Sequence, residues 1–257
     1  MIASTAKFAY LQARLQARHG VRNDAAAWRR LQSSVDFANY LQLAQQTALR
    51  SWVMSLHAAQ DSGEIEQTLR RLFRAHVEEV AAWVPAAWRP AIRWVRRLPD
   101  LPALRHLLAG EPAPAWLRED PDLRSFASEH MTIRLDAMRQ SDCRVLAQAW
   151  QAGTPLRDAW LEHWQALWPD AVRELRGMDE LRRLMRREML ALQQQTHGYG
   201  QEHLDILQAR LVSGFRRYSF LPAAAFLHLA LTSLDLARLR GDLLVRKLFR
   251  VSPEQVA

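Results

Sequence analysis

The chain has 257 residues, of which 49% are hydrophobic, enough to bury one sizeable core or two small ones. It contains nine glycines and no run of alternating β-branched residues between turn signals, so the composition excludes a β-rich fold and predicts an all-α protein. The formal net charge of +8 indicates an acidic partner surface, for which anionic lipid and nucleic acid are candidates. The single cysteine, Cys143, excludes an intramolecular disulfide and is compatible with a reducing compartment.

The sequence carries no signal for a membrane span or a secretory leader. Its first residues lack an apolar stretch, and the longest nearly apolar run, Leu221 to Leu231, is too short for a bilayer and contains His228. We therefore expect a soluble or peripheral protein in the cytoplasm.

Helix signals divide the first part of the chain into six segments. Each segment is bounded by capping residues, glycines or prolines and carries apolar residues at helical spacing. The expected helices cover residues 4–18, a short segment after Asn23 or Asp24, and residues 35–57, 64–83, 88–97 and 101–109. Asp100 is the expected cap of the last of these helices, with Pro102 in its first turn.

A proline-rich segment, residues 111–122, separates these helices from the second part of the chain. Its prolines predict a loop between two lobes, residues 1–110 and 123–257, of one all-α domain that spans residues 1–257. Trp116 indicates that this loop packs against the body of the protein. The helices expected after the loop, before the last one, cover residues 131–151, 155–168, 171–196 and 201–218.

The last helix, Leu221 to Arg250, is expected to be the longest or second longest, at roughly 40 Å. Pro222 lies in its first turn, where a proline is tolerated. Apolar residues surround the axis in the first half, which predicts that Phe226, Leu229 and Leu234 are buried. The second half narrows to one apolar stripe, so this helix should begin in the core and end at the surface.

No motif for catalysis or cofactor binding is present in the sequence, neither a phosphate-binding loop nor a nucleophile elbow. His76 with Glu79 comes nearest to a pair of metal ligands, and we interpret it as a pair at a helix surface or half buried. Cys143 is interpreted as a small hydrophobic residue rather than a nucleophile. We therefore expect no catalytic residue, cofactor or metal.

Ten tryptophans and one arginine-rich segment leave two interpretations open. Aromatic side chains among arginines can stack nucleic-acid bases, but tryptophans at helical spacing are more typical of a core, which we favour. The basic residues of the segment are Arg182, Arg183, Arg186 and Arg187. Because Glu180 and Glu188 flank them, a solvated helix face is favoured over a phosphate-binding stripe. The alternative is a basic all-α scaffold that binds nucleic acid or other proteins.

The two ends of the chain resemble the same protein family. The opening sequence, FAYLQARLQARHG, places Tyr10, Arg14 and Arg18 on an amphipathic helix. It resembles the first helix of the V-type and A-type ATPase subunit d/C family, in which an aromatic residue precedes Ala-Arg and a further basic residue. The closing pattern consists of Asp235, Leu236, Arg238, Leu239, Arg240 and Gly241. It resembles the terminal helix of that family, where an acidic residue precedes an apolar and arginine-containing stretch and a glycine.

Members of that family are all-α, funnel-shaped and non-catalytic, and they join the membrane rotor ring to the central stalk. This chain is shorter than usual members and has its proline-rich segment where they have further helices. The resemblance implies a funnel-like coupling subunit at the inner face of the membrane, with rotor-ring and central-stalk subunits as partners and no small-molecule substrate. The residues expected to contact these partners are Arg14, Arg18, Arg238, Arg240 and Arg246.

Overall fold

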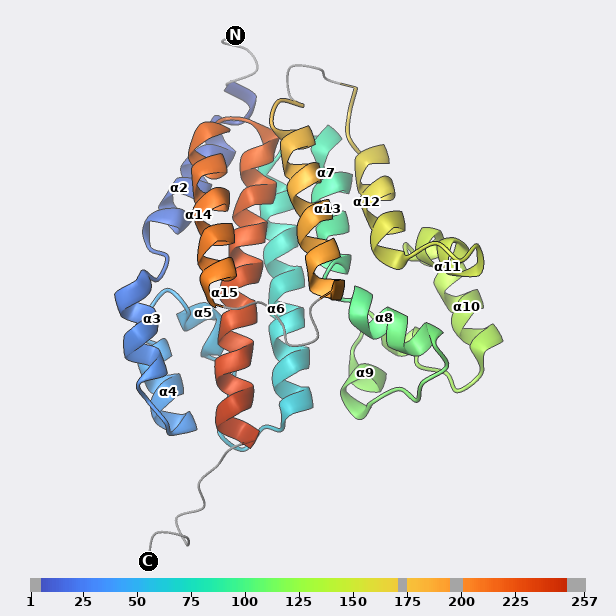
Figure 1. Ribbon diagram of the computed structural model, residues 1–257, viewed down its shortest axis with the longest axis horizontal. Coiled ribbons are helices and arrows are strands. Elements are labelled where there is room, and N and C mark those ends of the chain that lie inside the picture. Colours follow the sequence, from blue (N-terminus) through green and yellow to red (C-terminus); the bar gives the residue numbers. More distant parts are fainter. Residues whose placement is uncertain (1–5, 171–174, 195–200, 249–257) are drawn as a thin grey trace, which may run out of the picture.

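The computed structural model describes residues 6–170, 175–194 and 201–248, and every regular element within them is a helix, which confirms the all-α class (Figure 1). The first elements are α2 (Ala9–Gly20), α3 (Ala25–Gln32), α4 (Phe37–Ala44), α5 (Arg50–Val53), α6 (Ser62–Trp83), η1 (Ala86–Trp88), α7 (Arg89–Trp94), η2 (Val95–Arg97) and α8 (Leu101–Leu108). The remaining elements are α9 (Ala115–Glu119), η3 (Arg124–Phe126), α10 (Met131–Arg139), α11 (Arg144–Gln151), α12 (Leu156–Ala166), α13 (Met178–Gln194), α14 (Gln201–Arg217) and α15 (Pro222–Leu248).

The long helices form a bundle in which α15 is central (Figure 1). α15 packs against α14, α6, α2 and α13, and α14 runs antiparallel to both α13 and α15 (Figure 1). The short helices α8 to α11 form a lobe at one side of the bundle (Figure 1). The resemblance implied a funnel-like shape, whereas the arrangement is a bundle with a side lobe. Buried hydrophobic residues from both parts join in one cluster that extends from Phe8 to Leu243.

Helix α15 has the expected length and most of the expected burial. Its 27 described residues make it longer than the 22-residue α6. Phe226 and Leu229 are buried, as predicted, but Leu234 is only half buried. The prediction for Leu234 was wrong because the helix is enclosed on all sides only from Pro222 to Leu229, whereas Leu234 lies where the buried face has narrowed to a stripe. Residues 249 and 250 lie outside the described part.

Helix α6 follows its sequence signals closely. The Asp61 carboxylate accepts a hydrogen bond from the Glu64 backbone N–H, and the Glu64 side chain accepts one from the Asp61 N–H, a reciprocal capping box. The helix ends at Trp83, two residues before Pro85. These local signals explain why the prediction of residues 64–83 agrees with the structure within two residues at the start.

Two segments expected as single helices are each interrupted by non-helical residues. Between α4 and α5, the Asn23 side chain accepts a hydrogen bond from the Ala48 N–H, and the Thr47 hydroxyl accepts one from the Leu49 N–H. Between α10 and α11, the Ser141 hydroxyl accepts a hydrogen bond from the Cys143 N–H. Side chains that satisfy backbone groups in this way compete with the helix, which explains both interruptions.

The proline-rich segment packs against the body of the protein, as Trp116 indicated, and contributes to its core. It contains α9, whose Leu117 is fully buried, and the Arg70 guanidinium lies 5.0 Å from the centre of the Trp116 ring. Arg74 of α6 donates hydrogen bonds to Asp100 at 2.9 Å and to Asp120 at 2.8 Å, and both carboxylates are buried. The segment is therefore fixed to α6 by stacking, burial and charge.

Asp100 does not cap α8 with its side chain, which contradicts the prediction. Its carboxylate instead accepts hydrogen bonds from Arg70, Arg74 and Arg97. Burial by itself lowers the pKa of Arg74, but Asp100 and Asp120 outweigh that effect and raise it above its ordinary value. The attraction of three guanidinium groups thus takes the carboxylate away from the helix terminus.

Among the described helices, none has both the length and the apolar character of a membrane span.

Candidate functional site

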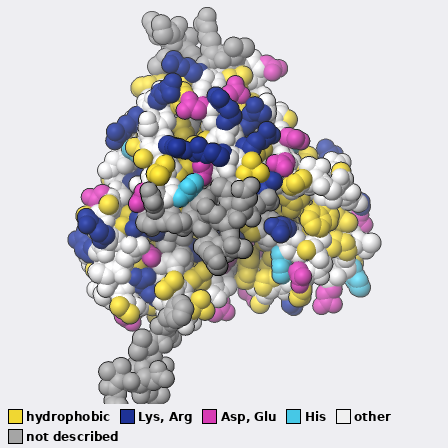
Figure 2. Space-filling model, in the orientation of Figure 1, with side chains coloured by type: hydrophobic (Ala, Val, Ile, Leu, Met, Phe, Trp, Pro, Cys, Tyr) yellow, Lys and Arg dark blue, Asp and Glu magenta, His cyan; other side chains and the backbone are white. Residues whose placement is uncertain are grey.

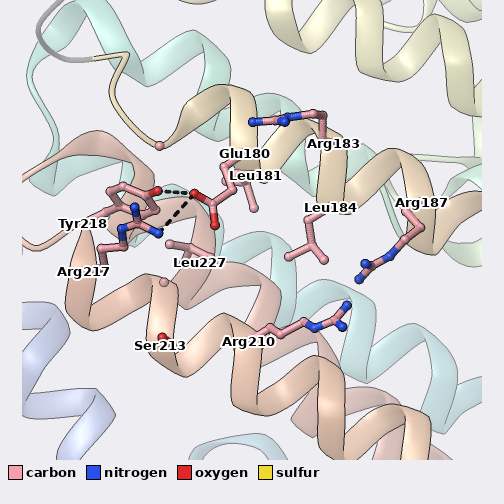
Figure 3. A pocket seen from close by; sticks show the side chains of 12 residues that line it. Glu180, Leu181, Arg183, Leu184, Arg187, Arg210, Ser213, Arg217, Tyr218 and Leu227 are labelled. Atoms are coloured by element: carbon pink, nitrogen blue, oxygen red, sulfur yellow. Dashed lines mark hydrogen bonds and ion pairs between the residues drawn. The ribbon is translucent and has the colours of Figure 1, made fainter.

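A basic groove of about 610 Å³ lies between α13 and α14 (Figure 3). Arginines of both helices line it, and Figure 2 shows dark blue side chains gathered on the bundle face where α13 and α14 lie. The charged residues of the groove are Arg183, Arg187, Arg210, Arg217 and Glu180. They leave a net charge of +3.

The floor of the groove is apolar. Leu181 of α13 and Leu227 of α15 are buried there, and Leu184 is half buried. A Cβ atom at Gly214 would lie only 3.3 Å from the Leu227 side chain, so the glycine allows α14 to approach α15 closely. A ligand in this groove would meet hydrocarbon below and guanidinium groups along the sides.

The end of the groove near the start of α13 is closed by a packed turn. Gly177 has a φ of 86°, a left-handed conformation that favours glycine, and a Cβ atom there would lie 2.7 Å from the Tyr218 ring. The Tyr218 hydroxyl donates to the Glu180 carboxylate, and this hydrogen bond, with burial, raises the pKa of Tyr218. Arg217 Nη1 lies 3.7 Å from the same carboxylate, so Glu180 offsets the charge at this end (Figure 3).

The other end of the groove is more strongly basic. The side chains of Arg187 on α13 and Arg210 on α14 point toward one another (Figure 3). Arg210 is exposed and has no carboxylate partner among the described residues. Two like charges that converge from facing helices make a position where an anion would be stabilised.

A buried carboxylate holds one of these two arginines in place. Glu188 accepts hydrogen bonds from Arg187 at 2.7 Å and from His203 at 2.7 Å. Burial by itself raises the pKa of Glu188, but these two hydrogen bonds outweigh it and keep the pKa below its ordinary value. The ionised Glu188 therefore orients Arg187, and counting it reduces the net charge of the site to +2.

The second open pocket, of about 820 Å³, lies between α7, α12 and the α10–α11 turn. Three of its four arginines are engaged in ion pairs: Arg93 with Glu78 at 2.8 Å, Arg96 with Asp142 at 2.7 Å and Arg139 with Asp136 at 2.6 Å. Because its carboxylates are already engaged with its arginines, this pocket is a weaker candidate for an anionic ligand.

The arginines predicted on α2 do not lie in either pocket. The guanidinium groups of Arg14 and Arg18 lie 5.2 Å and 5.0 Å from the centre of the Trp83 ring. Arg18 also pairs with Glu79. Both side chains thus contact α6 near its carboxyl end, and Arg14 is exposed while Arg18 is half buried.

The arginines predicted on α15 contact other elements. Arg238 lies 4.5 Å from the centre of the Trp28 ring of α3, and Arg246 lies 4.2 Å from that of Tyr40 of α4. Arg240 pairs with Glu66 near the start of α6. The five predicted residues therefore form separate groups, since Glu66 and the residues near Trp83 are roughly 25 Å apart along α6.

The arginine-rich segment of α13 is divided between two surfaces. Arg182 donates a hydrogen bond to Gln165 at 2.9 Å, toward the end of α12, and Arg186 is exposed. Arg183 and Arg187 line the groove. Sequence reasoning missed Arg210 and Arg217, although their spacing of seven residues places both on one face of α14.

The tryptophans belong to the core, which confirms the interpretation favoured from the sequence. None of the ten is exposed. The buried ones are Trp28, Trp83, Trp88, Trp94, Trp160 and Trp164, and the half-buried ones are Trp52, Trp116, Trp150 and Trp168. A platform of exposed tryptophans for base stacking is therefore absent.

Cys143 and the histidine pair are also enclosed. Burial raises the pKa of the Cys143 thiol to about 12, which agrees with a small hydrophobic role. His76 is buried, more deeply than predicted; its Nδ1 lies 3.4 Å from Glu79, and its Nε2 lies 3.0 Å from Nε2 of His228. Within the described residues, no group of histidine, cysteine and acidic side chains has an arrangement that could hold a metal ion.

Comparisons of the chain with protein-family models, with curated proteins and with solved structures find no match. The resemblance of the terminal helices to the subunit d/C family therefore stays a prediction, and the geometry of the chain itself must support any functional proposal.

Proposed function

We propose that this protein is a coupling subunit without enzymatic activity, which joins the central stalk to the membrane rotor ring of a rotary V/A-type ATPase or a related complex. The proposal combines the resemblance of the two chain ends with the way in which these ends meet. Its partners would be subunits of the ring and the stalk, and its place would be peripheral, at the inner face of the membrane.

The observation that carries the proposal is an ion pair between the closing pattern and Arg22, which lies two residues beyond the opening sequence. Arg22, just after α2, donates two hydrogen bonds of 2.8 Å to the carboxylate of Asp235, the acidic residue of the closing pattern. Such a two-point arginine–carboxylate contact fixes direction as well as distance. The segments lie more than two hundred positions apart in the sequence, yet they form one unit in the fold.

A second contact joins the same two ends of the chain. The buried Gln12 side chain accepts a hydrogen bond of 3.0 Å from the Phe220 backbone N–H, in the turn before α15. α2 and α15 both pack on α6, so the three helices make one continuous body. At 1.5 Å per residue, α15 is about 40 Å long, a length suited to a rigid connection between two partners.

The test is affinity purification of the tagged full-length chain from native membranes, followed by mass spectrometry. We expect ring or stalk subunits to be recovered, and recovery to fall in the double variant Arg14→Glu, Arg238→Glu. The matched control is Arg50→Glu, Arg105→Glu, which changes the charge equally at two exposed arginines whose side chains have no ion-pair or hydrogen-bond partner among the described residues. Circular dichroism checks that both variants remain folded.

A chain that stays in the soluble fraction without any ATPase component would contradict the proposal. Equal recovery with the variant and the control would show that Arg14 and Arg238 only pack against Trp83 and Trp28.

A further inference from the structure

We propose that the groove between α13 and α14 binds an acidic segment of a partner protein, with carboxylates at Arg187 and Arg210 and an apolar side chain on the leucine floor. The inference deepens the proposed function, because it rests on a role in docking partners and names the chemistry of one partner. Nothing in the resemblance of the chain ends involves α13 or α14.

Charge complementarity is the first reason. Arg187 and Arg210 point toward one another from two helices (Figure 3), and Arg210 has no carboxylate partner within the described chain. A carboxylate between two guanidinium groups would relieve their repulsion and accept charge-assisted hydrogen bonds from both. Arginine is well suited to this contact because its planar fork matches a carboxylate.

The shape of the groove favours a peptide over a single anion. Arg210 and Arg217 are seven residues apart on α14, which spreads the positive charge over roughly 10 Å. The volume of about 610 Å³ falls in the range of sites that hold ligands of several groups, whereas one phosphate would fill a small part of it.

The floor distinguishes a protein segment from a nucleic acid. Leu181 and Leu227 are buried beneath the arginines, and Leu184 is half buried. An acidic peptide with interspersed leucines would cover this surface and gain from its burial. Bases would require exposed aromatic rings. Among the described residues that line the groove, Tyr218 is the only aromatic one, and it is buried and bonded to Glu180.

The experiment measures fluorescence anisotropy of a labelled short peptide of glutamate and leucine, titrated with the full chain. We expect saturable binding that weakens with salt, and no comparable binding of the same peptide with glutamine in place of glutamate. Arg210→Glu should weaken binding by about tenfold, since reversing a charge in the contact replaces attraction by repulsion. The double variant Arg187→Glu, Arg210→Glu should weaken it further.

The matched control is again Arg50→Glu, Arg105→Glu, which should bind the peptide as the unmodified chain does. Arg210→Glu is the decisive single variant, because Arg210 contributes no ion pair to the fold in the described residues, whereas Arg187 contacts Glu188. Thermal unfolding of each variant separates a loss of binding from a loss of structure.

Three results would overturn the inference. Equal binding of the glutamine peptide would show that carboxylates are not recognised. Full competition by inorganic phosphate at a concentration comparable to that of the peptide would reveal a simple anion site. Tighter binding of a single-stranded RNA of similar length would assign the groove to nucleic acid. Failure of the membrane purification with intact peptide binding would leave this inference standing and remove the assignment to an ATPase.

Discussion

The substitution Asp100→Asn tests the buried ionic network that fixes the side lobe to the bundle. The Asp100 carboxylate is fully buried and accepts hydrogen bonds from Arg74 at 2.9 Å, Arg70 at 3.0 Å and Arg97 at 3.3 Å. Asparagine has nearly the same shape but carries no charge, and its amide NH2 group would face N–H donors of the arginines. The change therefore removes an attraction without creating a cavity.

The structure allows the magnitude to be bounded. Breaking a buried ion pair by removing one partner costs about 3–5 kcal/mol. Each of the three arginines keeps a second carboxylate: Asp120 for Arg74, Asp142 for Arg97 and Glu66 for Arg70. Because no guanidinium group is left without a partner, we expect the lower end, about 3 kcal/mol, or about 6–12 °C in Tm for a chain of this size.

Urea and thermal unfolding followed by circular dichroism would measure this loss. The matched control is Asp136→Asn, which removes the exposed pair with Arg139 and should cost less than about 1 kcal/mol. If Asp100→Asn and Asp136→Asn lowered the free energy of unfolding equally, the buried network would contribute no more to stability than an exposed ion pair.

Two further predictions concern the bundle. Burial lowers the pKa of both His76 and His228, so the unfolded chain binds protons more readily than the folded one. The free energy of unfolding should therefore fall as the pH drops below about 6.5, by up to about 1.4 kcal/mol per pH unit for each histidine. Urea unfolding at a series of pH values between 7 and 5 should show that the free energy of unfolding depends less steeply on pH in His228→Gln. An unchanged pH dependence would contradict its origin in the buried histidines. Gly177→Ala should destabilise more than Gly153→Ala, because both have positive φ but only at Gly177 would a Cβ atom meet the Tyr218 ring. We expect Gly153→Ala to lower the free energy of unfolding by about 1–2 kcal/mol through backbone strain alone. Equal losses of stability in the two variants would contradict the close packing of Tyr218 against Gly177.

Local signals in the sequence determined much of the fold. The capping box at Asp61 and the stop at Pro85 place α6, and the apolar residues around Phe226 predict a central helix. Tryptophan spacing predicted a core, and Cys143 was recognised as a small buried residue. These predictions succeeded because propensity, capping and periodicity act between residues a few positions apart.

The tertiary structure alone decided which charged residues meet. Asp100 has the sequence context of a cap but lies among three arginines, because α6 and η2 bring their guanidinium groups to it. Arg187 and Arg210 converge only once α13 and α14 pack antiparallel (Figure 3). Charged side chains have long reach and no periodic pattern of their own, so their partners depend on how distant helices pack. The sequence by itself therefore determined the helices and most of the core, and only their packing created the groove.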